Sequence, residues 1–143
     1  MSDYSLNHRI MAIDYGKVRI GIALTDPLIT FAYPFKTLLN DKNFWNEFTS
    51  IVEEKNVIKI ILGLPLKESG EEYGLTGTVL KFKEEVEKRT KAEVLLRDER
   101  YTSSIASEMI NSSVTKRSKR RDKSLIDQSA AAIILQDYLN ENK

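Results

Sequence analysis

The sequence predicts an α/β domain built on one mixed β-sheet with helices on both faces. The chain opens with apolar runs joined by short turns, which is typical of antiparallel strands, and Ile10–Leu24 alone reads as two strands around a turn. After residue 40, helical and strand patterns alternate, which indicates parallel strands joined by right-handed crossovers. With 143 residues the chain is long enough to bury one core, so we expect a single domain over residues 1–143.

Five runs along the chain are candidate strands. The first two lie on either side of the turn Asp14–Lys17, and Phe31–Leu39 is the third. Pro34 favours an edge position for this third strand, because proline cannot donate a hydrogen bond to a ladder. Val57–Leu62 and Glu93–Arg100 each follow a helical pattern, so we expect them to be parallel strands of the same sheet.

Four helices are predicted from apolar residues spaced three or four positions apart. They cover Asn43–Lys55, Gly77–Thr90, a segment from Thr102 or Ser103 to Asn111, and Ser124–Asn140. Asn40 and Asp41 are the N-cap candidates for the first helix. The side chains expected to face the core are Phe44, Phe48, Ile51, Val52, Val79, Phe82, Val86, Ile126, Ala130, Ile133 and Ile134. Lys67–Thr76, with two glycines and several charges, is predicted to be an exposed loop.

The composition narrows the chemistry that the chain can perform. It contains no cysteine, which excludes disulfides and thiolate metal sites. The single histidine, His8, argues against a histidine triad or a zinc site with several histidines. Catalysis must therefore rest on carboxylates, Lys, Arg, Ser, Thr or Tyr. Residues 1–8 form a polar tail without a signal-peptide pattern, and no apolar run has the length of a membrane span, so we expect a cytoplasmic protein with no membrane partner.

Carboxylates stand at matching ends of the predicted elements. Asp14 ends the first strand, Asp98 and Glu99 end the last strand, and Asp127 lies in the first turn of the last helix. Because parallel strands bring their carboxyl ends to one edge of a sheet, we expect these acids to lie close together. Such a cluster suits Mg²⁺ or Mn²⁺. Two such ions about 3.5–4 Å apart can activate a water and stabilise the leaving oxygen in phosphodiester cleavage.

Each acid also has an ordinary structural explanation. Asp14 fits a solvated hairpin turn, the two acids of the last strand can pair with the neighbouring Arg97 or Arg100, and Asp127 fits a helix cap. The placement of all of them at one edge favours the functional interpretation.

A basic segment precedes Asp127. Residues 112–123 are polar, and the last eight of them hold six basic side chains, which predicts an exposed, flexible loop. Clustered Lys and Arg gain affinity for nucleic acid by releasing counterions from the phosphate backbone. No aromatic residue is interleaved, so the loop is expected to contact the backbone rather than read bases. The side chains concerned are Lys116, Arg117, Lys119, Arg120 and Arg121.

Four motifs, taken in order, resemble those of a known family. They are Asp14-Tyr15-Gly16 with Arg19-Ile20-Gly21-Ile22-Ala23, Gly63-Leu64-Pro65-Leu66, Asp98-Glu99-Arg100-Tyr101-Thr102-Ser103, and Asp127-Gln128-Ser129-Ala130-Ala131. From about Arg9 to Leu139 the chain is similar to the YqgF family, also called RuvX. Its members are known as pre-16S rRNA nucleases and as Holliday junction resolvases.

The resemblance implies a ribonuclease H-like (RNase H-like) fold with strand order 3-2-1-4-5 and Asp14 on the central strand. It implies a Mg²⁺- or Mn²⁺-dependent nuclease that matures the 5′ end of 16S ribosomal RNA, the older proposal being cleavage of four-way DNA junctions. Asp14, Glu99 and Asp127 match the family's acidic residues and would hold metal and catalyse. Asp98 remains an alternative to Glu99, while Arg19 and Arg100 would help the basic loop to bind substrate.

Other hypotheses remain open. An actin-like ATPase also begins with an Asp-x-Gly hairpin, but it needs two such domains and 143 residues supply one. A catalytically silent module that binds RNA or the ribosome could keep the same fold. The expected partners are precursor rRNA or branched DNA. The sequence is compatible with a monomer or a homodimer, and junction cleavage would favour a symmetric dimer.

Overall fold

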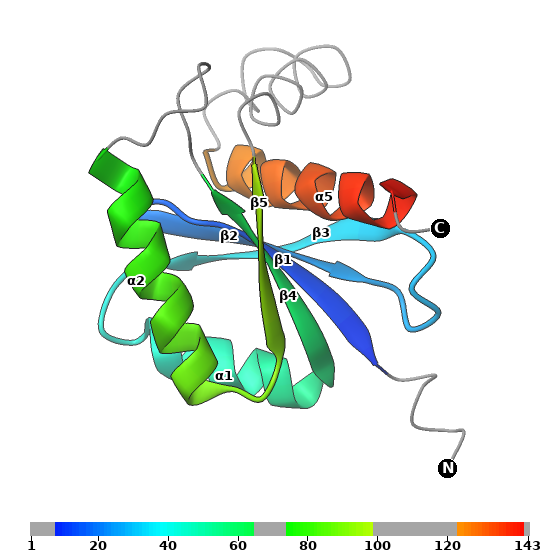
Figure 1. Cartoon of the computed structure of the whole chain (residues 1–143), viewed down its shortest axis with the longest axis horizontal. Helices are drawn as coiled ribbons and strands as arrows, with labels where there is room; N and C mark the ends of the chain where they lie inside the picture. The colour runs from blue at the N-terminus through cyan, green and yellow to red at the C-terminus, as the bar shows by residue number, and fades with distance from the viewer. Residues whose placement is uncertain (1–7, 65–73, 99–122, 142–143) are drawn as a thin grey trace.

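The computed structural model describes residues 8–64, 74–98 and 123–141, and it contains a five-stranded sheet in the order β3-β2-β1-β4-β5 (Figure 1). The strands are β1 (Arg9–Asp14), β2 (Arg19–Thr25), β3 (Ala32–Leu39), β4 (Val57–Leu64) and β5 (Glu93–Asp98). β2 runs antiparallel to both β1 and β3, whereas β4 runs parallel to β1 and β5. The predicted mixed sheet, its strand order and the edge position of the strand with Pro34 are confirmed.

Two helices, α1 (Phe44–Glu54) and α2 (Gly74–Arg89), cover one face of the sheet, and α5 (Lys123–Glu141) crosses the other face (Figure 1). Helices therefore lie on both faces, as predicted. All of the residues predicted to face the core from α1 and α2 are buried: Phe44, Phe48, Ile51, Val52, Val79, Phe82 and Val86. Their regular spacing was sufficient to identify the buried side of each helix.

The α5 helix packs closely on the sheet because its inner side is built from small residues. Ala131 is fully buried and belongs to the same core cluster as Ala12 of β1 and Ile61 of β4.

The predicted inner side of α5 is only partly right: Ala130 and Ile134 are buried, Ile133 is half-buried, and Leu135 is buried in its place. The Ile126 side chain lies outside the described residues. Polar contacts join the last turns of α5 to the sheet, from Gln136 to Ala32, Tyr138 to Lys59 and Glu141 to Arg97.

Several predicted boundaries need correction. The predicted loop Lys67–Thr76 ends in helix, because α2 already begins at Gly74 and Thr76 is buried against the core. The predicted basic loop 112–123 also ends in helix, because α5 begins at Lys123. At Thr76, burial against the core favours the helix despite the loop-like composition of the segment. The predicted third helix, the rest of both loops and residues 1–7 lie outside the described residues, and the extent of one domain over residues 1–143 stays a prediction.

The predicted N-cap of α1 is also wrong. The N-cap position is Asn43, and its side chain makes no capping hydrogen bond. Asp41 Oδ1 instead accepts the Asn43 backbone N–H at 2.9 Å, while Asn40 bonds to the turn after β1. Among the helices that the structure describes, none has the length and hydropathy needed to span a membrane.

Candidate active site at the end of the central strand

Asp14 is the last residue of β1, the central strand of the sheet, and it is half-buried. It pairs with Gly21 on β2, and on the other side the register that joins Ile13 to Leu62 brings it beside Gly63 of β4. Alternate residues of a strand share a face, and Ala12 packs in the cluster under α5. Asp14 therefore stands on the α5 face between two glycines, so neither flanking position adds a side chain beside its carboxylate.

Arg19 is the first residue of β2 and is half-buried. It lies two residues before Gly21, so it shares the α5 face with Asp14. The structure thus brings these two predicted site residues to the same end and the same face of the sheet.

Asp98 lies at the matching end of β5, where it pairs with Leu64 of β4. One strand separates β5 from β1, so the two backbones are roughly 10 Å apart. Strand alternation assigns the Asp98 position to the α1/α2 face, with the buried Val94, whereas Arg97 contacts Glu141 on the α5 face. Asp98 therefore reaches the predicted edge, but at a position that belongs to the face opposite Asp14.

The remaining predicted site residues are only partly covered by the structure. Asp127 is in α5, in the helical row of Ala131 and Ile134 that packs on the sheet, but its side chain lies outside the described residues. The others lie outside entirely: Glu99, Arg100, Lys116, Arg117, Lys119, Arg120 and Arg121. Within the described ranges, no three His, Cys, Asp or Glu side chains are grouped as metal ligands.

The turn after Asp14 contains a contact that the sequence did not predict. Asn40 Nδ2 donates to the Tyr15 hydroxyl oxygen at 3.0 Å and to the Gly16 carbonyl oxygen at 2.9 Å, and the Asn40 backbone N–H donates to the Val18 carbonyl oxygen at 2.9 Å. Asn40 is 24 residues from Gly16 in the sequence. Its position before a helix indicated only a cap, because no local pattern reports such a long-range contact.

Gly16 is required by the tight path of this turn. A Cβ atom at this position would lie 2.3 Å from the Arg19 carbonyl oxygen, well inside van der Waals contact. The close approach of backbone to backbone explains why a residue without a side chain occupies the turn between Asp14 and Arg19.

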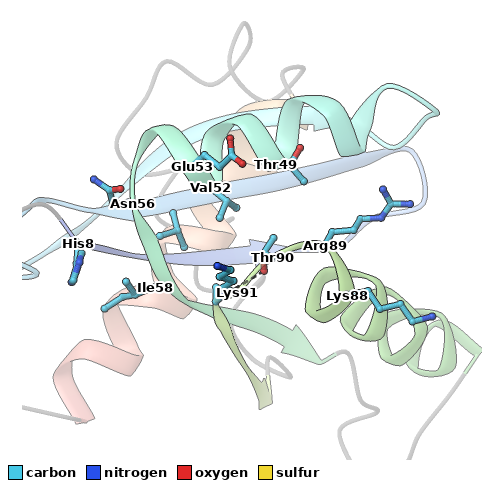
Figure 2. Close-up of a pocket in the computed structure, with 12 residues that line it drawn as sticks. His8, Thr49, Val52, Glu53, Asn56, Ile58, Lys88, Arg89, Thr90 and Lys91 are labelled. Atoms are coloured by element: carbon cyan, nitrogen blue, oxygen red, sulfur yellow. Dashed lines mark hydrogen bonds between the residues drawn. The ribbon is translucent and has the colours of Figure 1, made fainter. Parts of the chain in front are cut away.

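A pocket of about 680 Å³ lies at the opposite end of the sheet, where α1 and α2 end and β4 and β5 begin (Figure 2). Its lining includes Lys88, Arg89 and Lys91, and Glu53 is its one carboxylate among the described residues. The first two cations are already engaged: Arg89 Nε bonds to Glu85 at 3.0 Å, and Lys88 lies 3.8 Å from the same carboxylate. Two helix C-termini, which carry partial negative charge, also face this region. The pocket is therefore poorly suited to a phosphate group and lies apart from Asp14.

Comparison with known proteins establishes the family. The model of the family RuvX, described as Holliday junction resolvase, matches residues 8–141. The chain belongs to the RuvX family. A relative from Salinibacter ruber is 36% identical over 98% of this chain and 98% of its own, and one from Endomicrobium trichonymphae is 43% identical over 93% and 96%. Both carry the name "Putative pre-16S rRNA nuclease".

Solved structures agree on the fold of this RuvX-family chain. The Fowlpox virus Holliday junction resolvase superposes with a TM-score of 0.57 at 13% identity, covering 94% of this chain and 99% of its own. Thermus thermophilus RuvC gives a TM-score of 0.56 at 10% identity, covering 94% and 96%. At such identities the likeness concerns the fold alone. The predicted family, the RNase H-like fold and the nuclease class are confirmed.

Proposed function

We propose that this RuvX-family protein is a metal-dependent nuclease that processes the 5′ end of pre-16S ribosomal RNA. The observation that carries the proposal is the placement of Asp14 at the end of the central strand, on the α5 face, between Gly21 and Gly63. Because both neighbouring strand positions are glycines, no side chain of β2 or β4 stands directly beside this carboxylate. The names of the relatives indicate the RNA substrate.

We infer that Asp14, Glu99 and Asp127 hold Mg²⁺ or Mn²⁺. Carboxylate oxygens are the donors that both ions prefer. Asp14 supplies one such donor on the α5 face, and the Asp127 position belongs to the row of α5 that packs on this face. When bound, divalent metal supplies activation of a water and charge stabilisation of the leaving oxygen.

Glu99, rather than Asp98, is the proposed ligand from the last strand. Asp98 stands at a position of β5 that belongs to the face opposite Asp14. Glu99, the next residue in sequence, matches the acidic residue of the family's third motif, so we propose it as the partner of Asp14. Glu99→Gln should abolish cleavage, whereas Asp98→Asn should leave most of it. The reverse result would transfer the role to Asp98.

The cations are proposed to hold the phosphate backbone. Arg19 shares the face and the strand end of Asp14, and its guanidinium group can donate two hydrogen bonds to one phosphate. Arg100 and the basic side chains Lys116, Arg117, Lys119, Arg120 and Arg121 would extend this contact along the substrate. Their contribution should appear as a decrease in affinity with rising salt.

The testing experiment measures Mg²⁺- and Mn²⁺-dependent cleavage by the purified protein and by Asp14→Asn. The substrates are a precursor rRNA leader, unstructured RNA, single-stranded DNA and a four-way DNA junction. Asp41→Asn is the matched control, because Asp41 is exposed and its replacement removes the same charge while keeping an Oδ1 acceptor for the Asn43 N–H. Cleavage of the rRNA leader that is lost in Asp14→Asn and retained in Asp41→Asn is the expected result.

The second candidate function is resolution of four-way DNA junctions, which the family description favours. Cutting two strands symmetrically requires two active sites, so this activity predicts a homodimer, whereas RNA processing is compatible with a monomer. Cleavage of the junction alone would replace the ribosomal proposal with this one. Metal binding without cleavage of any substrate would instead indicate a silent module that binds RNA or the ribosome.

A further inference from the structure

We propose that Asn40 is a positioning residue that holds the turn Tyr15–Val18 and thereby sets the positions of Asp14 and Arg19. The inference rests on the proposed role of Asp14 and deepens it. Asn40 lies at the junction between β3 and α1, outside the hairpin that carries the two site residues. It is half-buried, so its hydrogen bonds are partly shielded from water.

Asn40 uses every donor that it has on this one turn. The two hydrogens of its side-chain amide go to the Tyr15 hydroxyl oxygen and to the Gly16 carbonyl oxygen, at 3.0 and 2.9 Å. Its backbone N–H goes to the Val18 carbonyl oxygen at 2.9 Å. Three bonds from a single residue therefore reach three of the four residues that separate Asp14 from Arg19.

Both the hydroxyl group and the ring of Tyr15, the neighbour of Asp14, make contacts that hold it in place. Its hydroxyl accepts the bond from Asn40, and its ring lies 4.9 Å from the ring of Phe82 on α2, measured between centroids. Phe82 is itself buried and packs against Phe44 at 5.6 Å. The turn is thus fixed to the core through Tyr15 and to the β3–α1 junction through Asn40.

Small displacements of this turn matter because Asp14 and Arg19 flank it directly. A displacement of a catalytic group by about 1 Å can cost a factor on the order of 100 in rate. Removal of the partner that orients a metal ligand typically costs about 10- to 100-fold in metal affinity or activity. Loss of the two side-chain donors of Asn40 should therefore reduce turnover and metal affinity more than it reduces substrate binding.

The test compares Asn40→Ala with Asn43→Ala in the full-length protein. Asn43 is the matched control, because it is exposed, lies three residues away and makes no capping hydrogen bond with its side chain. We expect Asn40→Ala to lower kcat and to raise the half-saturating Mn²⁺ concentration by about 10- to 100-fold, with a smaller rise in KM for RNA because Arg19 also flanks the turn. Asn43→Ala should match the wild type in all three.

Two further variants keep the test informative if Asn40→Ala folds poorly. Tyr15→Phe keeps the ring on Phe82 and removes only one acceptor, so it should show a smaller loss than Asn40→Ala. Asn40→Asp keeps the shape and the backbone N–H but, when ionised, has no side-chain donor, and it should behave like Asn40→Ala. Wild-type kcat and Mn²⁺ dependence in a folded Asn40→Asp would overturn the proposal.

Hydrogen–deuterium exchange separates this proposal from the proposed function, because it requires no cleavage. Faster exchange of the amides of residues 15–19 in Asn40→Ala than in Asn43→Ala would support the positioning role. Unchanged exchange would overturn it. A wild-type protein that cleaves nothing contradicts the proposed function alone, whereas normal cleavage in Asn40→Ala, with cleavage lost in Asp14→Asn, contradicts the role of Asn40 alone.

Discussion

The turn between β1 and β2 and the loop between β2 and β3 join the same strand to its two neighbours, yet different parts of the chain hold them. The loop Asp26–Phe31 is held by its own first residue. The Asp26 carboxylate accepts hydrogen bonds from the Leu28 N–H at 3.2 Å, the Thr30 N–H at 2.8 Å, the Thr30 hydroxyl at 2.7 Å and the Phe31 N–H at 2.9 Å. The turn after Asp14 depends instead on Asn40 and Phe82, which are distant in sequence.

These two arrangements have different electrostatic consequences. Burial opposes ionisation of Asp26 and would raise its pKa, but the bonds from Phe31, Thr30 and Leu28 outweigh this effect and lower the pKa from 3.8 to about 2. Within this loop, Ile29 has a left-handed conformation with a φ of 55°, and its backbone N–H donates to the Asp26 carbonyl oxygen at 2.9 Å. The turn after Asp14 is held by neutral hydrogen bonds and by packing, so we expect its geometry to follow the integrity of the core rather than pH.

The comparison indicates how the candidate site is coupled to the rest of the molecule. A loop that is stabilised by its own residues can keep its shape when distant parts of the fold change. A turn that is stabilised by β3, α1 and α2 transmits changes in those elements to Asp14 and Arg19. Variants can separate the two cases, because a change near one connection should leave the other unaffected.

The largest expected effect comes from Phe82→Ala. Truncation of this buried ring removes the support of Tyr15 and should lower the free energy of unfolding by about 3–5 kcal/mol. Phe31→Ala makes the same change in the loop Asp26–Phe31, where the side chain is 55% exposed, and should change stability by no more than about 0.5 kcal/mol. Urea unfolding of both variants measures the difference. Equal losses would show that the two connections depend equally on the core.

A smaller effect is expected from Gly16→Ala. The new Cβ would lie 2.3 Å from the Arg19 carbonyl oxygen, so the backbone of the turn must shift, at a cost of about 1–3 kcal/mol. Cleavage should fall as well, because Asp14 and Arg19 flank the shifted segment.

Gly77→Ala is the control for this substitution. Gly77 lies within α2, and a Cβ there meets nothing within 4 Å. Alanine should therefore stabilise the helix by about 0.5–1 kcal/mol. Thermal unfolding should show a lower melting temperature for Gly16→Ala and a higher one for Gly77→Ala. Cleavage assays should show a loss of activity in Gly16→Ala only. A stable, fully active Gly16→Ala would contradict the tight path of the turn.

The smallest effect is expected from Asp26→Asn and should depend on pH. The folded-state pKa of Asp26 is lower than the unfolded value of 3.8, so its carboxylate contributes stability above about pH 4 and loses that contribution as pH falls toward 2. Because water screens these bonds, we expect about 1 kcal/mol between wild type and variant at pH 6, and little difference at pH 2. Unfolding at both pH values is the measurement. A difference that does not change with pH would assign the stabilisation to the shape of Asp26 rather than to its charge.

Cleavage by Asp26→Asn, assayed at neutral pH, sharpens the same comparison. The loop lies at the end of the sheet away from Asp14, because β2 runs from the turn near Asp14 to Thr25. We expect the folded variant to cleave like the wild type. A loss as large as that of Asn40→Ala would mean that the two connections are coupled.

Local sequence patterns were sufficient to predict the strands, the buried sides of α1 and α2, and the position of Asp14 at the end of a strand. These features arise from patterns within one element, such as the spacing of Phe44, Phe48 and Ile51. The family motifs added the strand order. Local composition misjudged the start of α2 at Gly74 and the capping role of Asn40, because packing against distant residues decided both.

The assembled fold alone fixes which face of the sheet Asp14, Arg19 and Asp98 occupy and which residues hold the turn beside Asp14. The register of β4 with β1 and β5 places Asp98 on the face opposite Asp14, and the end of β3 brings Asn40 to Gly16. Each outcome depends on contacts between residues that are far apart along the chain. Such contacts form only when the whole sheet is assembled, so no short stretch of sequence carries a signal for them.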